Sequence, residues 1–254
     1  MASARQATAS NNGLLRIAPL SDGLFDRVCR LLPRQGREKD QCCDYDDEDN
    51  DQDNNSGHGG AFAEPATRCI VLSVTDLTKR LDRPIVLVGL MGVGKSTVGR
   101  RLAKRLGMPF VDSDAEIEDA AGYSAAEVFE RFGESDFRDG ERRLVARLVE
   151  GDVRVIATGG GAYVDPRTRQ LLNERAITIW LDAPVDILAE RTSRRDTRAQ
   201  LRNGDPKATL ERLSEERRPS YAQAHIHVKS GNGAHGDVVE SIVHSLEQYL
   251  AQRG

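Results

Sequence analysis

The sequence predicts one α/β domain with a mainly parallel β-sheet, preceded by a long polar extension. Three observations favour this architecture. From Pro84 onward, strand-like apolar runs alternate with helix-like segments across short gaps. The first run, at 85–88, leads into a turn punctuated by glycines, and a later run, at 153–157, ends in three consecutive glycines. Alternating strands and helices build parallel sheets, because each parallel pairing needs a crossover connection.

The two parts of the chain differ in composition. Of the 254 residues, 1–80 are mostly polar and irregular, and the tract DYDDEDNDQDNNSGHGG at 44–60 is strongly acidic. Such a tract repels itself and has little surface to bury, so it predicts disorder. We therefore expect a largely disordered extension at 1–80 and one folded domain at 81–254.

Composition also limits which partners the chain can bind and in which cellular compartment it is expected. No apolar run approaches the about 18 residues that a membrane-spanning helix needs, so we expect no membrane partner. The extension is too acidic and too weakly periodic to supply a helix-turn-helix, which argues against nucleic-acid binding. The cysteines lack CxxC spacing and indicate thiols in a reducing cytoplasm, although residues 1–20 weakly resemble an organellar transit peptide. These cysteines are Cys29, Cys42, Cys43 and Cys69.

Residues 85–97, IVLVGLMGVGKST, carry the pattern of a phosphate-binding loop. Four β-formers precede the spacing Gly89-x4-Gly94-Lys95-Ser96, and a helix-like segment follows to Leu106. Glycines let the backbone curl so that its N–H groups and the helix N-terminus hold phosphate oxygens. Lys95 can reach the β- and γ-phosphates, and the Ser96 hydroxyl can ligate Mg²⁺. We therefore predict nucleoside triphosphate binding. The expected contacts are Gly92, Val93, Gly94, Lys95, Ser96 and Thr97.

A second short strand, at 110–111, ends in Asp112-Ser113-Asp114. Two carboxylates at positions i and i+2 of a strand end share one face, about 7 Å apart. One could hold Mg²⁺ through water while the other accepts a hydrogen bond from a substrate hydroxyl. Alternatively, Asp112 or Ser113 merely caps the helix expected at 115–120. The pattern alone leaves both interpretations open.

Two further helices are expected before the next strand. A capping box at 124–127 opens a helix to about 131, and an arginine-rich helix runs from about 134 to 150. Within the second, Arg138 and Glu141 are three residues apart and can pair on one helical face. A solvated surface position is the usual environment of a helical arginine, so the spacing by itself gives Arg138 no ligand.

The strand expected at 153–157 ends in Thr158 and the glycines 159–161. At the carboxyl edge of a parallel sheet, such a turn lets backbone N–H groups approach a ligand closely. A simple flexible turn is the alternative. The remaining elements follow in order: a helix opened by Asp165-Pro166, a strand at 177–181, a helix from 182 to about 194, a helix from 205 to about 218 ended by RRPSY at 217–221, a strand at 226–228 and a helix at 237–252.

The segment SRRDTRAQLRN, at 193–203, is cationic and has few apolar anchors. We expect a mobile loop. It could close over the phosphate site and supply charge to the transferring group, or it could be a solvated loop with a nonspecific anion patch.

Taken in order, these motifs make residues 84 to about 250 resemble shikimate kinase. The matching segments are GLMGVGKSTVGRRLA at 89–103, FVDSDAEIE at 110–118, FRDGE at 137–141, ATGGGA at 157–162, TIWLDAP at 178–184 and RRPSY at 217–221. The resemblance implies a nucleoside monophosphate kinase-like fold, with a five-stranded parallel sheet flanked by helices and a mobile lid. It also implies transfer of the γ-phosphoryl group of MgATP to the 3-hydroxyl of shikimate. We expect a cytoplasmic monomer, with a plastid as the other location the family uses.

By the same resemblance, several residues acquire roles. Lys95, Asp114 and Arg198 are the expected catalytic residues, and Asp114 binds shikimate and positions its attacking hydroxyl. Asp112 joins Ser96 as the Mg²⁺ partner, and Arg191 stacks on adenine. The expected substrate contacts are Asp114, Arg138 (braced by Glu141), Gly160, Gly161 and Arg217.

This chain departs from the family pattern at two places. The lid reads Arg198-Ala199-Gln200-Leu201, where the family usually has Arg-Pro-Leu-Leu, so we expect looser closure. The loop at 231–236 lacks the proline that often lies beside adenine, which leaves that contact unassigned. A related sugar-acid kinase, such as a gluconate kinase, is the nearest alternative. The two carboxylate-binding arginines and the three glycines argue against it.

Overall fold

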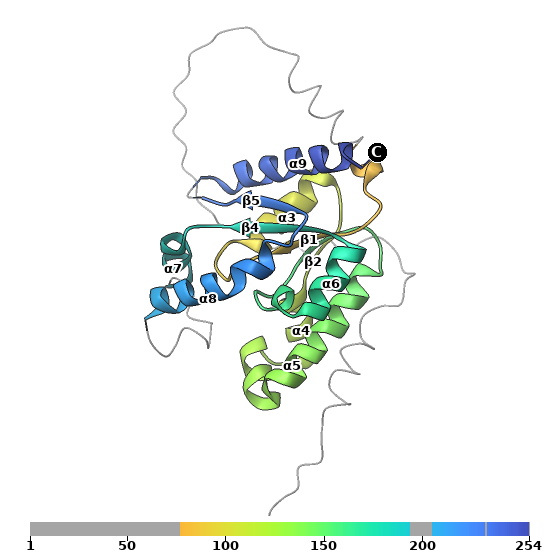
Figure 1. The fold of residues 1–254 in the computed structure, drawn as a ribbon. Coiled ribbons are helices and arrows are strands. Elements are labelled where there is room, and N and C mark those ends of the chain that lie inside the picture. The colour runs from red at the N-terminus through yellow and green to blue at the C-terminus, as the bar shows by residue number, and fades with distance from the viewer. Residues whose placement is uncertain (1–76, 194–204, 232, 254) are drawn as a thin grey trace, which may run out of the picture.

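The computed structural model describes residues 77–193, 205–231 and 233–253. Five strands form one parallel sheet in the order β2-β3-β1-β4-β5, which confirms the predicted fold class (Figure 1). The strands are β1 (Ile85–Val88), β2 (Phe110–Asp112), β3 (Val155–Ala157), β4 (Ile177–Asp182) and β5 (Ile226–Lys229). All four residues of β1 are buried, as expected for a central strand covered on both faces.

The order of the strands indicates where in the sheet a ligand is expected to bind. β1 pairs with β3 on one side and with β4 on the other. The chain goes from β1 to β2 and β3 in one direction, and then crosses β1 to reach β4 and β5. The carboxyl end of β1 is therefore where the winding direction reverses, and open α/β sheets bind ligands at such a point.

Helices cover both faces of the sheet. They are α3 (Lys95–Leu106), α4 (Ser113–Ala121), α5 (Ala125–Val149), η1, a short 3-10 helix (Ala162–Val164), α6 (Pro166–Arg175), α7 (Val185–Ser193), α8 (Pro206–Tyr221) and α9 (His235–Ala251). On one face α3 and α9 pack together, while α5 and α6 pack together on the other side (Figure 1). In the part of the chain that the structure describes, no helix combines the length and apolarity needed to span a membrane.

Local sequence signals account for most helix ends. Gly107 ends α3 in a left-handed conformation, with φ 65°, and its N–H bonds the carbonyls of the last turn. The side chain of Asp165 caps α6 by accepting the N–H of Thr168 at 2.8 Å. The capping box is present too, because the Ser124 and Glu127 side chains each accept the other's backbone N–H.

The two helices expected at 124–131 and 134–150 are confirmed: together they make up α5, and they meet at Gly133, whose φ of 83° and ψ of 168° are not helical. Glycine reaches this conformation at little cost, so the chain changes direction without a separate loop. Helix α8 continues through Pro219 to Tyr221 instead of ending near 218. Proline removes one N–H donor there, in the last turn, where little helix remains to be disrupted.

Candidate active site

The phosphate-binding loop follows β1 and requires glycine at particular positions. Gly89, Gly92 and Gly94 have φ of 137°, 81° and 95°, which side-chain-bearing residues rarely adopt. A Cβ on Gly89 would also collide with the carbonyl oxygen of Leu181, at the end of β4. Gly94 caps α3 without any side-chain hydrogen bond. The first N–H groups of α3 therefore point at the loop unopposed by a side chain, an arrangement that favours anions.

Lys95 lies across this loop. Its side chain is only 9% exposed, and Nζ donates to the carbonyl oxygens of Gly89 and Leu90, both at 2.9 Å. The ammonium group of Lys95 therefore lies inside the curl of the loop, where two neutral carbonyls hold it. That charge adds to the positive end of α3, so the loop is suited to a polyanionic ligand.

Ser96 and Asp112 meet beside the loop. Ser96 Oγ donates to Asp112 Oδ2 at 2.5 Å, and Asp112 Oδ1 accepts the backbone N–H of Asp114 at 3.1 Å. Asp112 therefore caps α4 and also reaches the phosphate-binding loop. The two alternatives left open by the sequence are compatible, because each carboxylate oxygen does one task.

The oxygens of Ser96 and Asp112 fit a hard cation. Hydroxyl and carboxylate oxygens are the ligands that Mg²⁺ prefers. Within the described residues, no group of three or more His, Cys, Asp and Glu side chains could hold a metal by itself. A Mg²⁺ ion here would therefore depend on phosphate oxygens of a ligand as well, as is usual for this ion in kinases.

Arg138 and Glu141 form the predicted pair on α5. Arg138 Nη1 lies 2.6 Å from Glu141 Oε2, and Glu141 is 2% exposed. The guanidinium lies directly against Gly161, where a Cβ would be 2.5 Å from both Nη1 and Nη2. Arg138 therefore does not occupy the solvated surface position that is usual for a helical arginine. Its guanidinium faces the turn at 159–161 instead.

The carboxylates of Glu141 and Asp114 also lie against the turn at 159–161. A Cβ on Gly159 would lie 2.6 Å from Glu141 Oε1 and 2.7 Å from Asp114 Oδ1. Gly159 N also donates to Ser113 Oγ at 3.2 Å, which ties the turn to the start of α4. Glycine is needed here because charged side chains from α4 and α5 occupy the space of a side chain. The alternative of a simple flexible turn is therefore not supported.

Arg217 reaches the turn from the opposite side, on α8. Its Nη1 donates to Gly160 O at 3.3 Å, and the Tyr221 hydroxyl donates to the same oxygen at 2.5 Å. A Cβ on Gly160 would lie 3.4 Å from Met91 N, so the turn adjoins the phosphate-binding loop. No role was predicted for Tyr221. The spacing of four residues between Arg217 and Tyr221, which puts both on one helical face, was the available signal.

Arg191 lies away from this cluster, on α7. Its Nη2 donates to Gly231 O at 2.9 Å, and its Nη1 is buried with no hydrogen-bond partner among the described residues. Near it, His235 opens α9 and faces Gly94, and burial together with the charges of Arg101 and Arg191 lowers the pKa of His235. Arg198, with Ala199 and Gln200, lies outside the described residues, as do all four cysteines and residues 1–76 of the extension.

The electrostatics of the turn centre on Glu141. Burial raises the pKa of its carboxyl above the ordinary value of 4.5. Arg138 opposes that shift, while the neighbouring charges of Asp114 and Asp165 add to it. The raised pKa means that the folded chain holds this proton more tightly than the unfolded chain does. Stability therefore falls as pH rises from 4.5 through the folded-state pKa.

This sign can be tested with Glu141→Gln. The glutamine has no titrating proton, so the free energy of unfolding of the variant minus that of the wild type should increase as pH is raised above 4.5. Chemical denaturation of both proteins at a series of pH values measures this difference, in which the other carboxyl groups largely cancel. A difference that instead decreases with pH would mean that the Arg138 charge outweighs burial.

The comparisons with known proteins agree with one another. The family model for shikimate kinase matches residues 91–247. The shikimate kinase of Caulobacter vibrioides is 53% identical over 173 residues, which cover 68% of this chain and 86% of that protein. The shikimate kinase of Novosphingobium aromaticivorans is 51% identical over 176 residues, covering 68% and 91%. Among solved structures, shikimate kinase from Acinetobacter baumannii in complex with shikimate is 38% identical, with a TM-score of 0.64 over 65% of this chain and 93% of that one.

Proposed function

The chain belongs to the shikimate kinase family, and we propose that the residues gathered at the carboxyl edge of its sheet carry out the reaction of that family. The chain uses ATP to phosphorylate shikimate, and the group is transferred to the 3-hydroxyl, giving shikimate 3-phosphate and ADP. One observation carries this assignment to the site. The turn at 159–161, flanked by Arg138 and Arg217, adjoins the phosphate-binding loop, so an acceptor placed there faces the γ-phosphate.

On the donor side, Gly92 to Thr97 hold the phosphates of ATP. Backbone N–H groups of the loop and the N-terminus of α3 bind phosphate oxygens, and Lys95 neutralises charge on the transferring group. Arg191 contacts the adenine from α7, and Arg198 of the lid adds a second positive charge. The buried Nη1 of Arg191, beside the loop that precedes α9, supports its role.

Ser96 and Asp112 would hold the Mg²⁺ ion that accompanies ATP. Their oxygens are already close together at the end of β2 and the start of α3. When bound, Mg²⁺ neutralises phosphate charge as it develops during transfer. Asp112 is kept in place for this purpose by the N–H of Asp114.

On the acceptor side, positively charged side chains select a substrate that carries a negative carboxylate. Arg138 and Arg217 bind the carboxylate of shikimate, since a planar guanidinium matches a carboxylate better than an ammonium does. Backbone atoms of Gly160 and Gly161 contact the ring of the substrate. Asp114 accepts a hydrogen bond from the attacking hydroxyl, orients it in line with the γ-phosphate and is placed to take its proton.

A coupled assay of ADP release tests the proposal. Release should be stimulated by shikimate in the presence of MgATP, and gluconate should give no stimulation. Equal stimulation by gluconate would contradict the acceptor assignment. Size-exclusion chromatography with light scattering tests the further expectation that the chain acts as a monomer, and fractionation of cells tests the cytoplasmic location.

A further inference from the structure

We infer that Tyr221 is a positioning residue for the carboxylate end of shikimate: its hydroxyl fixes the Gly160 carbonyl and thereby the placement of Arg217. The inference rests on the proposed function and names a residue to which neither the motif pattern nor the proposed mechanism assigns a task. Tyr221 acts through its neighbours and is not proposed to touch the reacting atoms.

The carbonyl oxygen of Gly160 accepts hydrogen bonds from both Tyr221 and Arg217. Tyr221 is 1% exposed, and its hydroxyl donates to Gly160 O at 2.5 Å across 61 residues of sequence. Arg217 Nη1 donates to the same oxygen at 3.3 Å. A carbonyl oxygen has two lone pairs, and both are used here. Because Tyr221 takes one of them, a single N–H of Arg217 completes the carbonyl. Arg217 also makes a side-chain hydrogen bond to Tyr221 itself, so the tyrosine holds the guanidinium directly as well as through Gly160. A guanidinium has five N–H donors, which leaves others for a carboxylate.

The ring of Tyr221 has little freedom to move. It stacks with both Tyr163 and Trp180, with ring centroids 6.4 Å and 6.1 Å away and interplanar angles of 11° and 26°. Trp180 in turn stacks on His227 at 4.1 Å. A buried ring that stacks with two aromatic neighbours has few other directions in which to point its hydroxyl. The hydrogen bond to Gly160 is therefore set by the aromatic column rather than by the turn itself.

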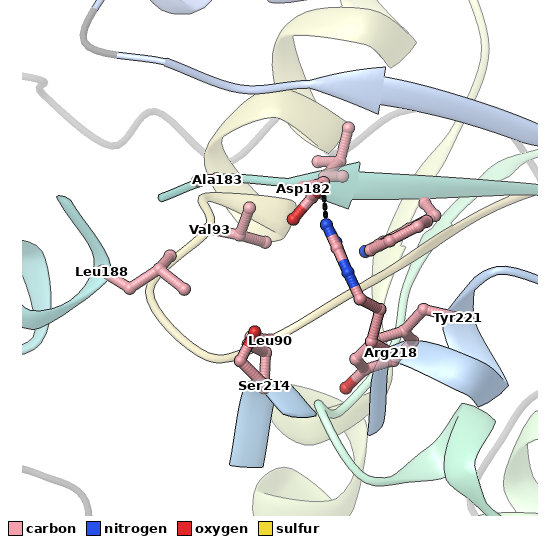
Figure 2. Close-up of a pocket in the computed structure, with 10 residues that line it drawn as sticks. Leu90, Val93, Asp182, Ala183, Leu188, Ser214, Arg218 and Tyr221 are labelled. Atoms are coloured by element: carbon pink, nitrogen blue, oxygen red, sulfur yellow. Dashed lines mark hydrogen bonds and ion pairs between the residues drawn. The ribbon is translucent and has the colours of Figure 1, made fainter. Parts of the chain in front are cut away.

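The same turn of α8 has a second attachment. Arg218 Nη2 donates to Asp182 Oδ2 at 3.2 Å, at the carboxyl end of β4, and Figure 2 shows Arg218 and Tyr221 lying together on α8. Arg217 thus directly precedes one anchored residue of the helix and lies about one turn before the other. Arg218 fixes the helix to the sheet, and Tyr221 fixes it to the glycine turn.

The phenol keeps the proton that this role requires. Burial raises the pKa of Tyr221, while the charges of Arg217 and Arg138 partly oppose the shift. The folded chain therefore retains a neutral hydroxyl donor at neutral pH.

Tyr163 offers a matched control. It is also buried, belongs to the same aromatic column and uses its hydroxyl, but it donates to Asn173 Oδ1 at 2.7 Å and not to the turn. Replacing either tyrosine by phenylalanine removes one buried hydroxyl and keeps the stacking. Only the change at position 221 alters the partners of Gly160 O.

We expect Tyr221→Phe to raise the KM for shikimate about fivefold, the ratio that corresponds to one typical hydrogen bond of ~1 kcal/mol. The KM for ATP should not change, and Tyr163→Phe should leave both constants unchanged. In an Arg217→Lys background the effect of Tyr221→Phe should shrink below twofold, because there is no guanidinium left to position. Thermal unfolding of the wild type, the three single variants and the double variant shows whether they are folded.

Three outcomes would overturn the inference. The first is an unchanged KM for shikimate in Tyr221→Phe. The second is a parallel rise in both KM values with a lower Tm, which indicates a structural role alone. The third is the full fivefold effect in the Arg217→Lys background. Each of these outcomes is judged against a wild-type protein that phosphorylates shikimate. If the wild type itself shows no shikimate-dependent ADP release, the proposed function and the inference are both contradicted.

Discussion

Replacing Asp114 by asparagine is expected to abolish phosphorylation of shikimate while leaving ATP binding nearly intact. Asp114 Oδ1 lies against Gly159, beside the carboxylate of Glu141, on the acceptor side of the site. Asparagine keeps the shape but cannot take a proton, and a positioned acid or base contributes about 10²- to 10⁴-fold to rate. The nucleotide contacts on the loop at 92–97 are untouched, so the Kd for ATP should change little.

The measurement is the kcat of the coupled assay together with the Kd for ATP from calorimetry. Asp119→Asn is a matched control, because it makes the same chemical change on an exposed position of the same helix, α4. That variant should keep wild-type turnover. Turnover close to wild type in Asp114→Asn would contradict its assignment, and a large loss of ATP affinity would place Asp114 on the donor side instead.

The sequence predicted the local parts of the site because local spacing determines them. The pairing of Arg138 with Glu141 follows from residues three apart on one helix, and the structure confirms it at 2.6 Å. The phosphate-binding loop likewise follows from glycine spacing between a strand and a helix, and three of its glycines have positive φ. In both cases the partners are close in sequence, so few conformations compete.

The contacts between distant segments could not be predicted from the pattern of elements. Whether Gly159 meets Asp114 depends on β2 lying next to β3, and alternating strands and helices are compatible with several strand orders. The bond from Tyr221 to Gly160 depends additionally on how α8 crosses the sheet. The resemblance to a family implied the substrate roles of Arg138 and Arg217, but it did not reveal why positions 159 and 161 must be glycine. Packing against charged side chains provides that reason.

Replacing Arg138 by alanine is expected to lower both substrate affinity and stability, for separable reasons. A hydrogen bond to a charged group contributes about 1.5–3 kcal/mol, so the KM for shikimate should rise roughly 10- to 150-fold. The KM for ATP should stay near the wild-type value. The same change leaves the buried carboxylate of Glu141 without its guanidinium partner, and breaking a buried pair in this way costs about 3–5 kcal/mol.

The double variant Arg138→Ala with Glu141→Gln separates the two effects. A neutral glutamine removes the buried unpaired charge, so the free energy of unfolding should recover by most of the amount lost in Arg138→Ala. The KM for shikimate should remain as high as in the single variant, because the carboxylate still lacks the guanidinium. Denaturant unfolding and steady-state kinetics on wild type, both single variants and the double variant complete the cycle. Recovery of the KM together with stability would mean that Arg138 serves only to neutralise Glu141, and the substrate carboxylate would then be held by Arg217 alone.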